Sequence, residues 1–197
     1  ILTEYNGEAY RNNVTVKLNA QTCKITVNRD IMVDYDGGAY FTVKLVSADG
    51  KVPASGLTVV FTINGKSMAV KSDGNGIAKI RIGEVPKKYI ITTAFNGNVY
   101  KNTVTVKQVL KAKKVTVKKS ARKFSIKATL KINGKLIKGK KITFKFNGKT
   151  YKVKTNRKGI AKKTLNRKVI KKLKRGKTYA VKVTYLKDTI KTTVKVK

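Results

Sequence analysis

Residues 144–164, FKFNGKTYKVKTNRKGIAKKT, carry eight Lys or Arg side chains and no acid, with an apolar or aromatic residue at nearly every second position of the first half. An alternation of period two predicts a β-strand with one buried and one wet face. The Asn-Gly pair at 147–148 is a strong signal for a two-residue hairpin turn. The cross-strand pairs expected around this turn are Phe144 with Tyr151, Ile142 with Val153, Thr143 with Lys152, and Lys145 with Thr150.

The same hairpin pattern occurs earlier in the chain. Residues 61–79, FTINGKSMAVKSDGNGIAK, align without gaps with residues 144–162 at an offset of 83. Both hairpins are expected to bury one face and expose the other, because cross-strand neighbours share a face of the sheet. The pairs expected in the earlier hairpin are Phe61 with Met68, Val59 with Val70, and Thr62 with Ser67.

A second set of segments repeats at an offset of 90. Residues 5–17, 95–107 and 185–197 align with one another without gaps. The chain is therefore interpreted as the end of one repeat followed by two whole repeats. The expected domains are residues 1–21, the C-terminal strands of a preceding repeat, residues 22–107, and the strongly basic residues 108–197.

The two offsets differ by seven residues, which places an insertion in residues 165–177 of the last repeat. Leu165, Val169 and Leu173 recur there at a spacing of four, which fits one or two helical turns. An irregular loop fits the insertion equally well.

Each repeat is predicted to be an all-β sandwich. Residues 73–76 and 156–159 each begin with a side chain that caps its own turn and end with Gly, where a left-handed conformation is needed. About seven short strands in about ninety residues are the signature of an immunoglobulin-like (Ig-like) β-sandwich, and a parallel sheet is excluded because crossover helices are missing. Beside the hairpin strands, the expected strands are 25–27, 40–46, 89–94, 99–106, 115–117, 124–132, 179–185 and 189–196.

Two longer segments resemble a known family. Residues 50–82, GKVPASGLTVVFTINGKSMAVKSDGNGIAKIRI, and residues 134–165, GKLIKGKKITFKFNGKTYKVKTNRKGIAKKTL, resemble the bacterial Ig-like repeats of invasin and intimin type. They are most similar to the tandem repeats of the adhesin-like surface proteins of methanogenic archaea. The resemblance covers nearly the whole chain and brings no binding-site motif with it.

The location and several partners are expected from this resemblance. It implies a secreted, extracellular protein on the cell surface or in the cell wall, whose repeats form a stalk and whose lysine-rich last repeats resemble wall anchors. Neighbouring Ig-like repeats of the same chain, and a host-cell or microbial surface target of the full-length protein, are the implied partners. No run of about 18 apolar residues is present, so membrane insertion is not expected.

The positive charge is concentrated in the last ninety residues. The 197-residue chain has 47 Lys and Arg against 9 Asp and Glu, a net charge of +38. Residues 108–197 hold 33 of these bases and one acid, whereas residues 22–107 hold twelve bases and six acids. Only four of the 33 are Arg, and Lys suits diffuse, salt-sensitive attraction more than shaped recognition. Such a surface repels itself and favours a polyanionic partner.

The last repeat is therefore predicted to bind an anionic cell-wall polymer, a polysaccharide or a peptide polymer, through many weak contacts. A solvated coat is the alternative, because outward strand positions are polar and Lys on edge strands discourages aggregation. A coat alone does not explain why the two repeats differ so much in charge. The predicted polyanion-binding residues are Lys138, Lys140, Lys141, Lys152, Lys154, Lys168, Lys171, Lys172, Lys174, Arg175 and Lys177.

A protein that binds nucleic acid or another polyanion, and a plain spacer with no ligand, are the competing functions. Counterion release from phosphates would give nucleic-acid binding the same salt dependence. The sequence has no Trp, and Phe144 and Tyr151 fall on the predicted inward face. It also has no nucleic-acid-binding motif, so specific binding of nucleic acid is not expected.

No enzyme activity is expected, and no catalytic, cofactor-binding or metal-binding residue is assigned. General acid–base catalysis most often uses His, and the chain has none. Asp188 is the single acid of the last repeat, which leaves no carboxylate pair there. Residues 34–38, DYDGG, fit an ordinary turn better than a calcium loop.

A lysine–asparagine pair and the single cysteine are the further candidates for covalent chemistry. An isopeptide crosslink between Lys24 and Asn102, promoted by Asp30 or Asp34, is an alternative whose spacing is not diagnostic. Cys23 has no partner for a disulfide or a metal site, so it is expected to be a small strand residue.

Overall fold

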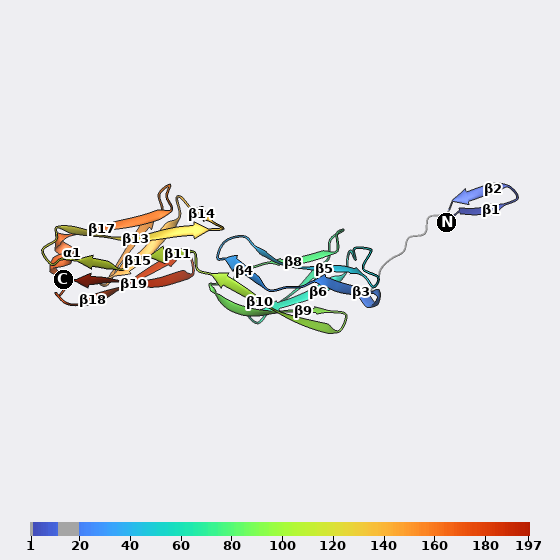
Figure 1. Cartoon of the computed structure of the whole chain (residues 1–197), viewed down its shortest axis with the longest axis horizontal. Coiled ribbons are helices and arrows are strands. Elements are labelled where there is room, and N and C mark those ends of the chain that lie inside the picture. The colour runs from blue at the N-terminus through green and yellow to red at the C-terminus, as the bar shows by residue number, and fades with distance from the viewer. Residues whose placement is uncertain (1, 12–19) are drawn as a thin grey trace. The chain divides into compact units, whose positions relative to one another are not determined.

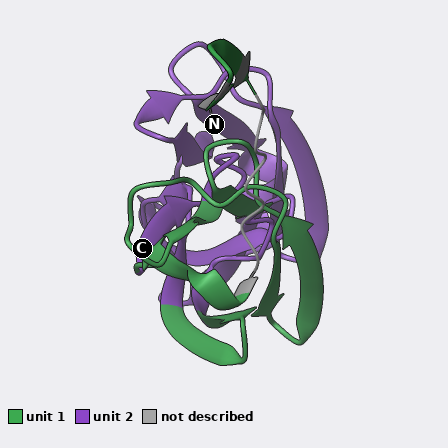
Figure 2. Cartoon of the chain, turned by 90° about the vertical axis from the view of Figure 1, so that its right-hand side faces the viewer, with its two compact units in different colours: residues 1–29, 41–80, 90–102 green, residues 30–40, 81–89, 103–197 purple. Residues whose placement is uncertain are grey.

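The computed structural model describes residues 2–11 and 20–197, and its regular structure is almost entirely β-strand (Figure 1). The chain divides into two compact units (Figure 2). Unit 1 holds residues 1–29, 41–80 and 90–102, and unit 2 holds residues 30–40, 81–89 and 103–197. The domain boundary expected after residue 107 does not coincide with these units, and it stays a prediction.

The first described strands form a short hairpin. β1 (Leu2–Tyr5) pairs antiparallel with β2 (Glu8–Arg11). Asn6 and Gly7 at the turn have φ values of 49° and 77°, which a tight hairpin turn requires. Residues 12–17 of the expected strand lie outside the described residues.

The first whole repeat builds two sheets. The smaller sheet has the strand order β3-β5-β8, and the larger has the order β4-β10-β9-β6-β7. A 3-10 turn, η1 (Ala20–Thr22), precedes the first strand. The strands are β3 (Cys23–Val27), β4 (Ile31–Asp34), β5 (Tyr40–Ser47), β6 (Thr58–Ile63), β7 (Lys66–Lys71), β8 (Ile77–Arg81), β9 (Lys87–Phe95) and β10 (Asn98–Lys107).

The second repeat builds the same two sheets. The smaller has the order β11-β13-β14 with β17 also paired to β13, and the larger has the order β12-β19-β18-β15-β16. This common order, with all regular structure in strands apart from η1 and one helical turn, makes both repeats all-β Ig-like sandwiches, as predicted. The strands are β11 (Leu110–Ala112), β12 (Val115–Val117), β13 (Lys123–Ile132), β14 (Lys135–Leu136), β15 (Lys141–Phe146), β16 (Lys149–Lys154), β17 (Ile160–Asn166), β18 (Thr178–Tyr185) and β19 (Asp188–Val196).

Both predicted hairpin registers are confirmed. All the pairs expected around the two Asn-Gly turns are present in β6 with β7 and in β15 with β16. Asn64 and Asn147 have φ values of 52° and 45°, and the glycines after them are also left-handed. Asn and Gly therefore occupy the positions where a turn of this hand needs residues that tolerate positive φ.

The burial of these hairpins is less even than predicted. Phe61 and Phe144 on the inner strands are fully buried, but Met68 on β7 is 37% exposed and Tyr151 on β16 is half-buried. The physical reason is that β7 and β16 are the outermost strands of five-stranded sheets, which extend beyond the smaller sheets that cover them.

Neither large sheet is a parallel sheet, in agreement with the prediction, but each contains one parallel pair that the sequence did not indicate. β4 pairs parallel with β10, and β12 pairs parallel with β19. A chain that moves between the two layers of a sandwich can reach the far edge of a sheet without a crossover helix. The hairpins and the other strand pairs whose residue-by-residue register is known are antiparallel.

The turns that follow both hairpins agree with the prediction. The Oδ1 atom of Asp73 accepts hydrogen bonds from Asn75 N and Ile77 N, and that of Asn156 accepts from Lys158 N and Ile160 N. Gly76 closes the first of these turns with a φ of 73°. A Cβ atom there would lie 2.2 Å from the carbonyl oxygen of Leu45, so glycine is required.

The insertion in the second repeat contains a helical turn, α1 (Arg167–Lys171), at the same end of the sandwich as the C-terminus (Figure 1). Asn166 caps it, with Oδ1 accepting a hydrogen bond from Val169 N at 3.4 Å. Leu165 and Leu173 are buried as expected, but Ile170 rather than Val169 is the fully buried residue of the helix. The four-residue spacing from Leu165 therefore does not mark the buried side of the helix, because Leu165 belongs to β17 and α1 begins only at Arg167.

Candidate polyanion-binding surface

All eleven predicted polyanion-binding residues are exposed. Sheet register divides them into separate places rather than one patch. Lys141, Lys152 and Lys154 lie on the outward face of the large sheet, where they alternate with inward-facing residues. Lys138 and Lys140 lie between β14 and β15, and Lys168, Lys171, Lys172, Lys174, Arg175 and Lys177 lie on α1 or shortly after it.

The outward face of the sheet β12-β19-β18-β15-β16 carries more lysine than the sequence indicated. Lys145 lies directly opposite Lys182, and Lys182 lies directly opposite Lys191. Adjacent strands are about 4.8 Å apart, so three cationic side chains follow one another across the sheet. We call this surface the lysine face, and its exposed lysines are Lys141, Lys145, Lys152, Lys154, Lys182, Lys191 and Lys195.

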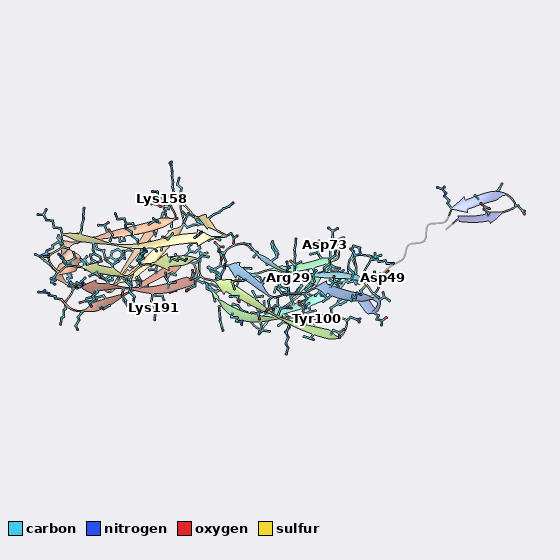
Figure 3. All side chains as sticks on the ribbon, in the orientation of Figure 1. Arg29, Asp49, Asp73, Tyr100, Lys158 and Lys191 are labelled. Atoms are coloured by element: carbon cyan, nitrogen blue, oxygen red, sulfur yellow. The ribbon has the colours of Figure 1, made fainter. Side chains whose placement is uncertain are left out.

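A row of threonines runs beside the lysine row. Thr143 lies opposite Thr184, and Thr184 lies opposite Thr189 with their Oγ1 atoms 3.1 Å apart. Hydroxyl groups therefore lie next to the ammonium groups on the same face. Figure 3 shows Lys191 of this face and Lys158, in the turn before β17, on opposite sides of the sandwich.

The one acid of residues 108–197 does not neutralise this surface. Asp188 is 0% exposed, and its Oδ2 atom accepts hydrogen bonds from Val109 N at 2.9 Å and Leu110 N at 3.1 Å. The carboxylate thus holds the chain segment that enters the repeat. The lysine face is left without a side-chain carboxylate from its own repeat.

The sequence missed Lys145, Lys182 and Lys191 as a group. Hairpin turns give the register of neighbouring strands, but β15 and β18 are far apart in sequence. The alternation of each strand marks these lysines as outward, and only the pairing of the two strands brings them together.

Residues 34–38 form a turn, as predicted. Gly37 N donates to the carbonyl oxygen of Asp34 at 3.0 Å, and the Asp34 carboxylate forms an ion pair with Lys107 Nζ at 3.1 Å. Among residues 2–11 and 20–197, no group of three or more His, Cys, Asp or Glu side chains is placed to hold a metal ion.

The isopeptide alternative is not supported by the fold. Lys24 is exposed on β3 in the small sheet, whereas Asn102 lies on β10 in the large sheet. A hydrogen bond from Ser47 lowers the pKa of Asp49 most, and the charge of Lys24 adds to this effect. The positive charge of Lys24 therefore stabilises the ionised form of Asp49, an exposed carboxylate close to β3. Cys23 is buried at the start of β3 and carries a free thiol, as expected.

The aromatic residues do not form a row on the surface of the second repeat. Phe144 is fully buried, as predicted, and Tyr151 is half-buried with Lys163 Nζ 5.0 Å from the centre of its ring. Successive exposed rings are the usual means of holding single-stranded nucleic acid. In the part of the chain that the structure describes, no helix has the length and apolar character needed to cross a bilayer.

Solved structures with tandem Ig-like domains are similar to this chain. The I9-I11 tandem of titin aligns at 14% identity over 88% of this chain and 65% of that chain, with a TM-score of 0.49. The D00-D0 domain of intimin aligns at 15% identity over 87% and 96%, with a TM-score of 0.37. The adhesin InvE of Yersinia pseudotuberculosis aligns at 14% identity over 90% and 59%, with a TM-score of 0.34.

These similarities concern the fold alone. The chain spans less than two thirds of the titin tandem and of InvE. No family model matches the chain, and no curated protein matches it in sequence.

Proposed function

We propose that the chain is part of the stalk of an extracellular, adhesin-like surface protein, and that residues 108–197 attach it to the cell wall by binding an anionic wall polymer. The sequence resemblance to adhesin-like repeats supports the stalk. Tandem duplication supports it as well, because stalks are commonly built from repeated domains that each contact their neighbours in the chain.

Hydrogen bonds inside unit 2 support a stiff connection. Asn133 donates from N to Asp34 Oδ2 at 2.7 Å and from Nδ2 to the carbonyl oxygen of Gly37 at 2.8 Å. The hydroxyl group of Tyr185 donates to Asp36 Oδ2 at 2.8 Å. Burial, followed by this hydrogen bond, raises the pKa of Tyr185 well above its usual range, so the phenol remains a donor at neutral pH. These bonds join residues that the sequence assigns to different repeats.

The observation that carries the polymer-binding role is the row formed by Lys145, Lys182 and Lys191. Like charges directly opposite one another on a sheet destabilise the fold. An anionic polymer lying across the strands would meet a positive charge about every 5 Å and remove this repulsion. Lysine on edge strands protects against aggregation, but β18 is an interior strand of its sheet, so edge protection does not explain Lys182.

The test is retention of the whole chain on an immobilised carboxylated polysaccharide, polygalacturonate, at physiological ionic strength. The triple variant Lys145→Gln, Lys182→Gln and Lys191→Gln is expected to be retained about tenfold less, because neighbouring contacts on one face act together. A matched variant, Lys111→Gln, Lys123→Gln and Lys158→Gln, removes the same charge from exposed positions outside the lysine face and is expected to lose much less.

Three outcomes would contradict the proposal. Equal loss in both triple variants would mean that net charge alone governs retention. Tighter retention on double-stranded DNA than on the polysaccharide at the same ionic strength would favour the nucleic-acid alternative. If neither polymer retains the chain, a plain spacer with no ligand is favoured.

A further inference from the structure

A cavity of about 580 Å³ opens between the outermost strand β16 and the helical turn α1. Its wall combines an apolar part with a ring of cations. Tyr151 and Val169 supply the apolar part, and the cationic side chains are Lys149, Lys168, Lys171 and Lys172. The volume lies within the range of about 300–1,000 Å³ that is usual for small-ligand sites.

The aromatic ring of this cavity is only partly covered. Tyr151 lies opposite Phe144 on the inward side of β16, but the sheet edge leaves it half-buried. Lys163 Nζ stands over the ring, 5.0 Å from its centre. This cation is attracted to the ring and adds to the positive potential near the cavity, which Tyr151 also lines.

The helical side of the cavity is held in place from the core. Ile170 is fully buried, so α1 cannot rotate without exposing it. Lys119 Nζ donates hydrogen bonds to the carbonyl oxygens of Ile170 and Lys171, at 3.3 Å and 3.0 Å. Arg167 donates to the carbonyl oxygens of Lys119 and Ala121. The lysines on the outer side of the turn are thus presented from a fixed backbone.

The first repeat has no equivalent of this cavity wall. β8 ends at Arg81 and β9 begins at Lys87, with no helix between them. Met68 occupies the position of Tyr151, one repeat earlier at the offset of 83. The seven inserted residues therefore add a wall, with three of its lysines, only to the repeat that carries the excess charge.

We propose that this cavity binds one acidic sugar unit of the wall polymer, with the C–H face of the sugar against Tyr151 and Val169 and its carboxylate among the four lysines. This inference rests on the proposed polymer binding and names the chemical class of the ligand. Amphipathic aromatic rings suit a ligand with one apolar and one polar side. Nucleic acid fits less well, because single strands are usually held by several aromatic rings in succession, and Tyr151 is the one aromatic residue among the described residues that line this cavity.

The experiment is calorimetric titration of the whole chain with digalacturonic acid, a disaccharide that offers one or two acidic sugar units to the cavity. Saturable binding is expected. The double variant Lys168→Gln and Lys172→Gln is expected to bind about tenfold more weakly, because charge-assisted contacts to the carboxylate are lost. Tyr151→Leu is expected to weaken binding as well, and Tyr151→Phe to change it little, because the ring and not the hydroxyl group contacts the sugar.

The matched control is Lys145→Gln with Lys182→Gln on the lysine face, which is expected to change the affinity for digalacturonic acid less than about twofold. Equal losses in the two double variants would overturn the inference. Equally tight binding of neutral maltose, or tighter binding of adenosine monophosphate, would also overturn it. If Tyr151→Leu fails to fold, the two lysine variants decide.

The two proposals fail in different ways. If digalacturonic acid does not bind but polygalacturonate still retains the chain through the lysine face, the cavity is not a sugar site and the proposed function stands. If immobilised polygalacturonate does not retain the chain either, the proposed function fails.

Discussion

The two repeats build the same sheet face from different side chains. In the first repeat Thr62 lies opposite Thr92, and in the second Lys145 lies opposite Lys182 at the corresponding positions. Thr62 also forms a hydrogen bond of 2.8 Å with Ser67 across its hairpin. Outward positions contribute little to the core, so one backbone accepts both sets. The fold therefore does not require lysine at these positions.

The edge of the large sheet shows the same difference. In the first repeat Asp34 and Lys107 end the parallel ladder as an ion pair. In the second repeat the ladder pairs Val117 with Val196, and the next residues on the two strands are Lys118 and Lys197. The first repeat cancels charge where the second accumulates it.

The largest effect is expected at Asp188, whose counterpart in the first repeat is the exposed Asn98. Asp188→Ala leaves the buried N–H groups of Val109 and Leu110 without an acceptor and is expected to lower the free energy of unfolding by about 3 kcal/mol. Asn98→Ala is expected to change it by less than about 0.5 kcal/mol. Urea unfolding followed by circular dichroism measures both, and equal effects would contradict the structural role of the Asp188 carboxylate.

A pH-dependent effect of intermediate size is expected at Asp34. Burial acts to raise the pKa of Asp34, but hydrogen bonds from Lys107 and Asn133 and the nearby cations outweigh it, so the pKa lies below the usual 3.8. The ionised carboxylate therefore contributes stability that is fully present above pH 3.8 and is lost as the pH falls through the lowered pKa. Asp34→Asn is expected to cost up to about 1 kcal/mol at neutral pH.

The measurement for Asp34 is thermal unfolding of the native protein and of Asp34→Asn between neutral pH and pH 2. The difference between the two proteins is expected to shrink below pH 3.8. A difference that stays constant with pH would show that the ion pair with Lys107 does not contribute.

A smaller effect is expected when the central residues of the two sheet faces, Lys182 and Thr92, are exchanged. Lys182→Thr removes two like-charge pairs and is expected to stabilise the second repeat by about 0.5–1 kcal/mol at low ionic strength. Thr92→Lys gives the first repeat its own central lysine and is expected to be destabilising by less than this. Both effects should fade in about 1 M salt, where charges are screened beyond about 3 Å. Effects independent of salt would contradict an electrostatic origin.

The smallest effect is expected at the last hairpin turn, where Leu186 replaces the Asn96 of the first repeat. Leu186 has a φ of 51° and is 63% exposed, so a branched residue holds a left-handed conformation without burying its side chain. Leu186→Asn is expected to stabilise the protein by about 0.5 kcal/mol, and Asn96→Leu to destabilise it by a similar amount. The melting temperatures of the two variants test these expectations. A melting temperature lower than that of the native protein for Leu186→Asn would contradict the expected stabilisation.

Local features were readable from the sequence because their physical causes are local. The hairpin registers follow from the Asn-Gly turns and from alternation within six residues on either side. The parallel pairing of β4 with β10 was not readable, since residues about seventy positions apart form it. The burial of Ile170 was missed for a related reason. The strand β17 ends at Asn166 and the helix α1 begins at the next residue, so the spacing of buried residues changes there from that of a strand to that of a helix.

For the candidate site, the sequence found the sign and the region of the charge. It placed Lys152 and Lys154 on an outward face, which the strand β16 confirms. It did not find the row through Lys182, and it did not find the cavity beside Tyr151, because both depend on strands and a helical turn that meet only in the folded chain.

Alternation, turn residues and composition were enough to predict the all-β Ig-like class, the duplication and the excess of lysine, because these signals act within each repeat. The opposing lysines and the burial of Asp188 became visible in the folded chain. Register between distant strands follows from packing two sheets into one core, and that packing turns a list of charges into a surface with a defined spacing.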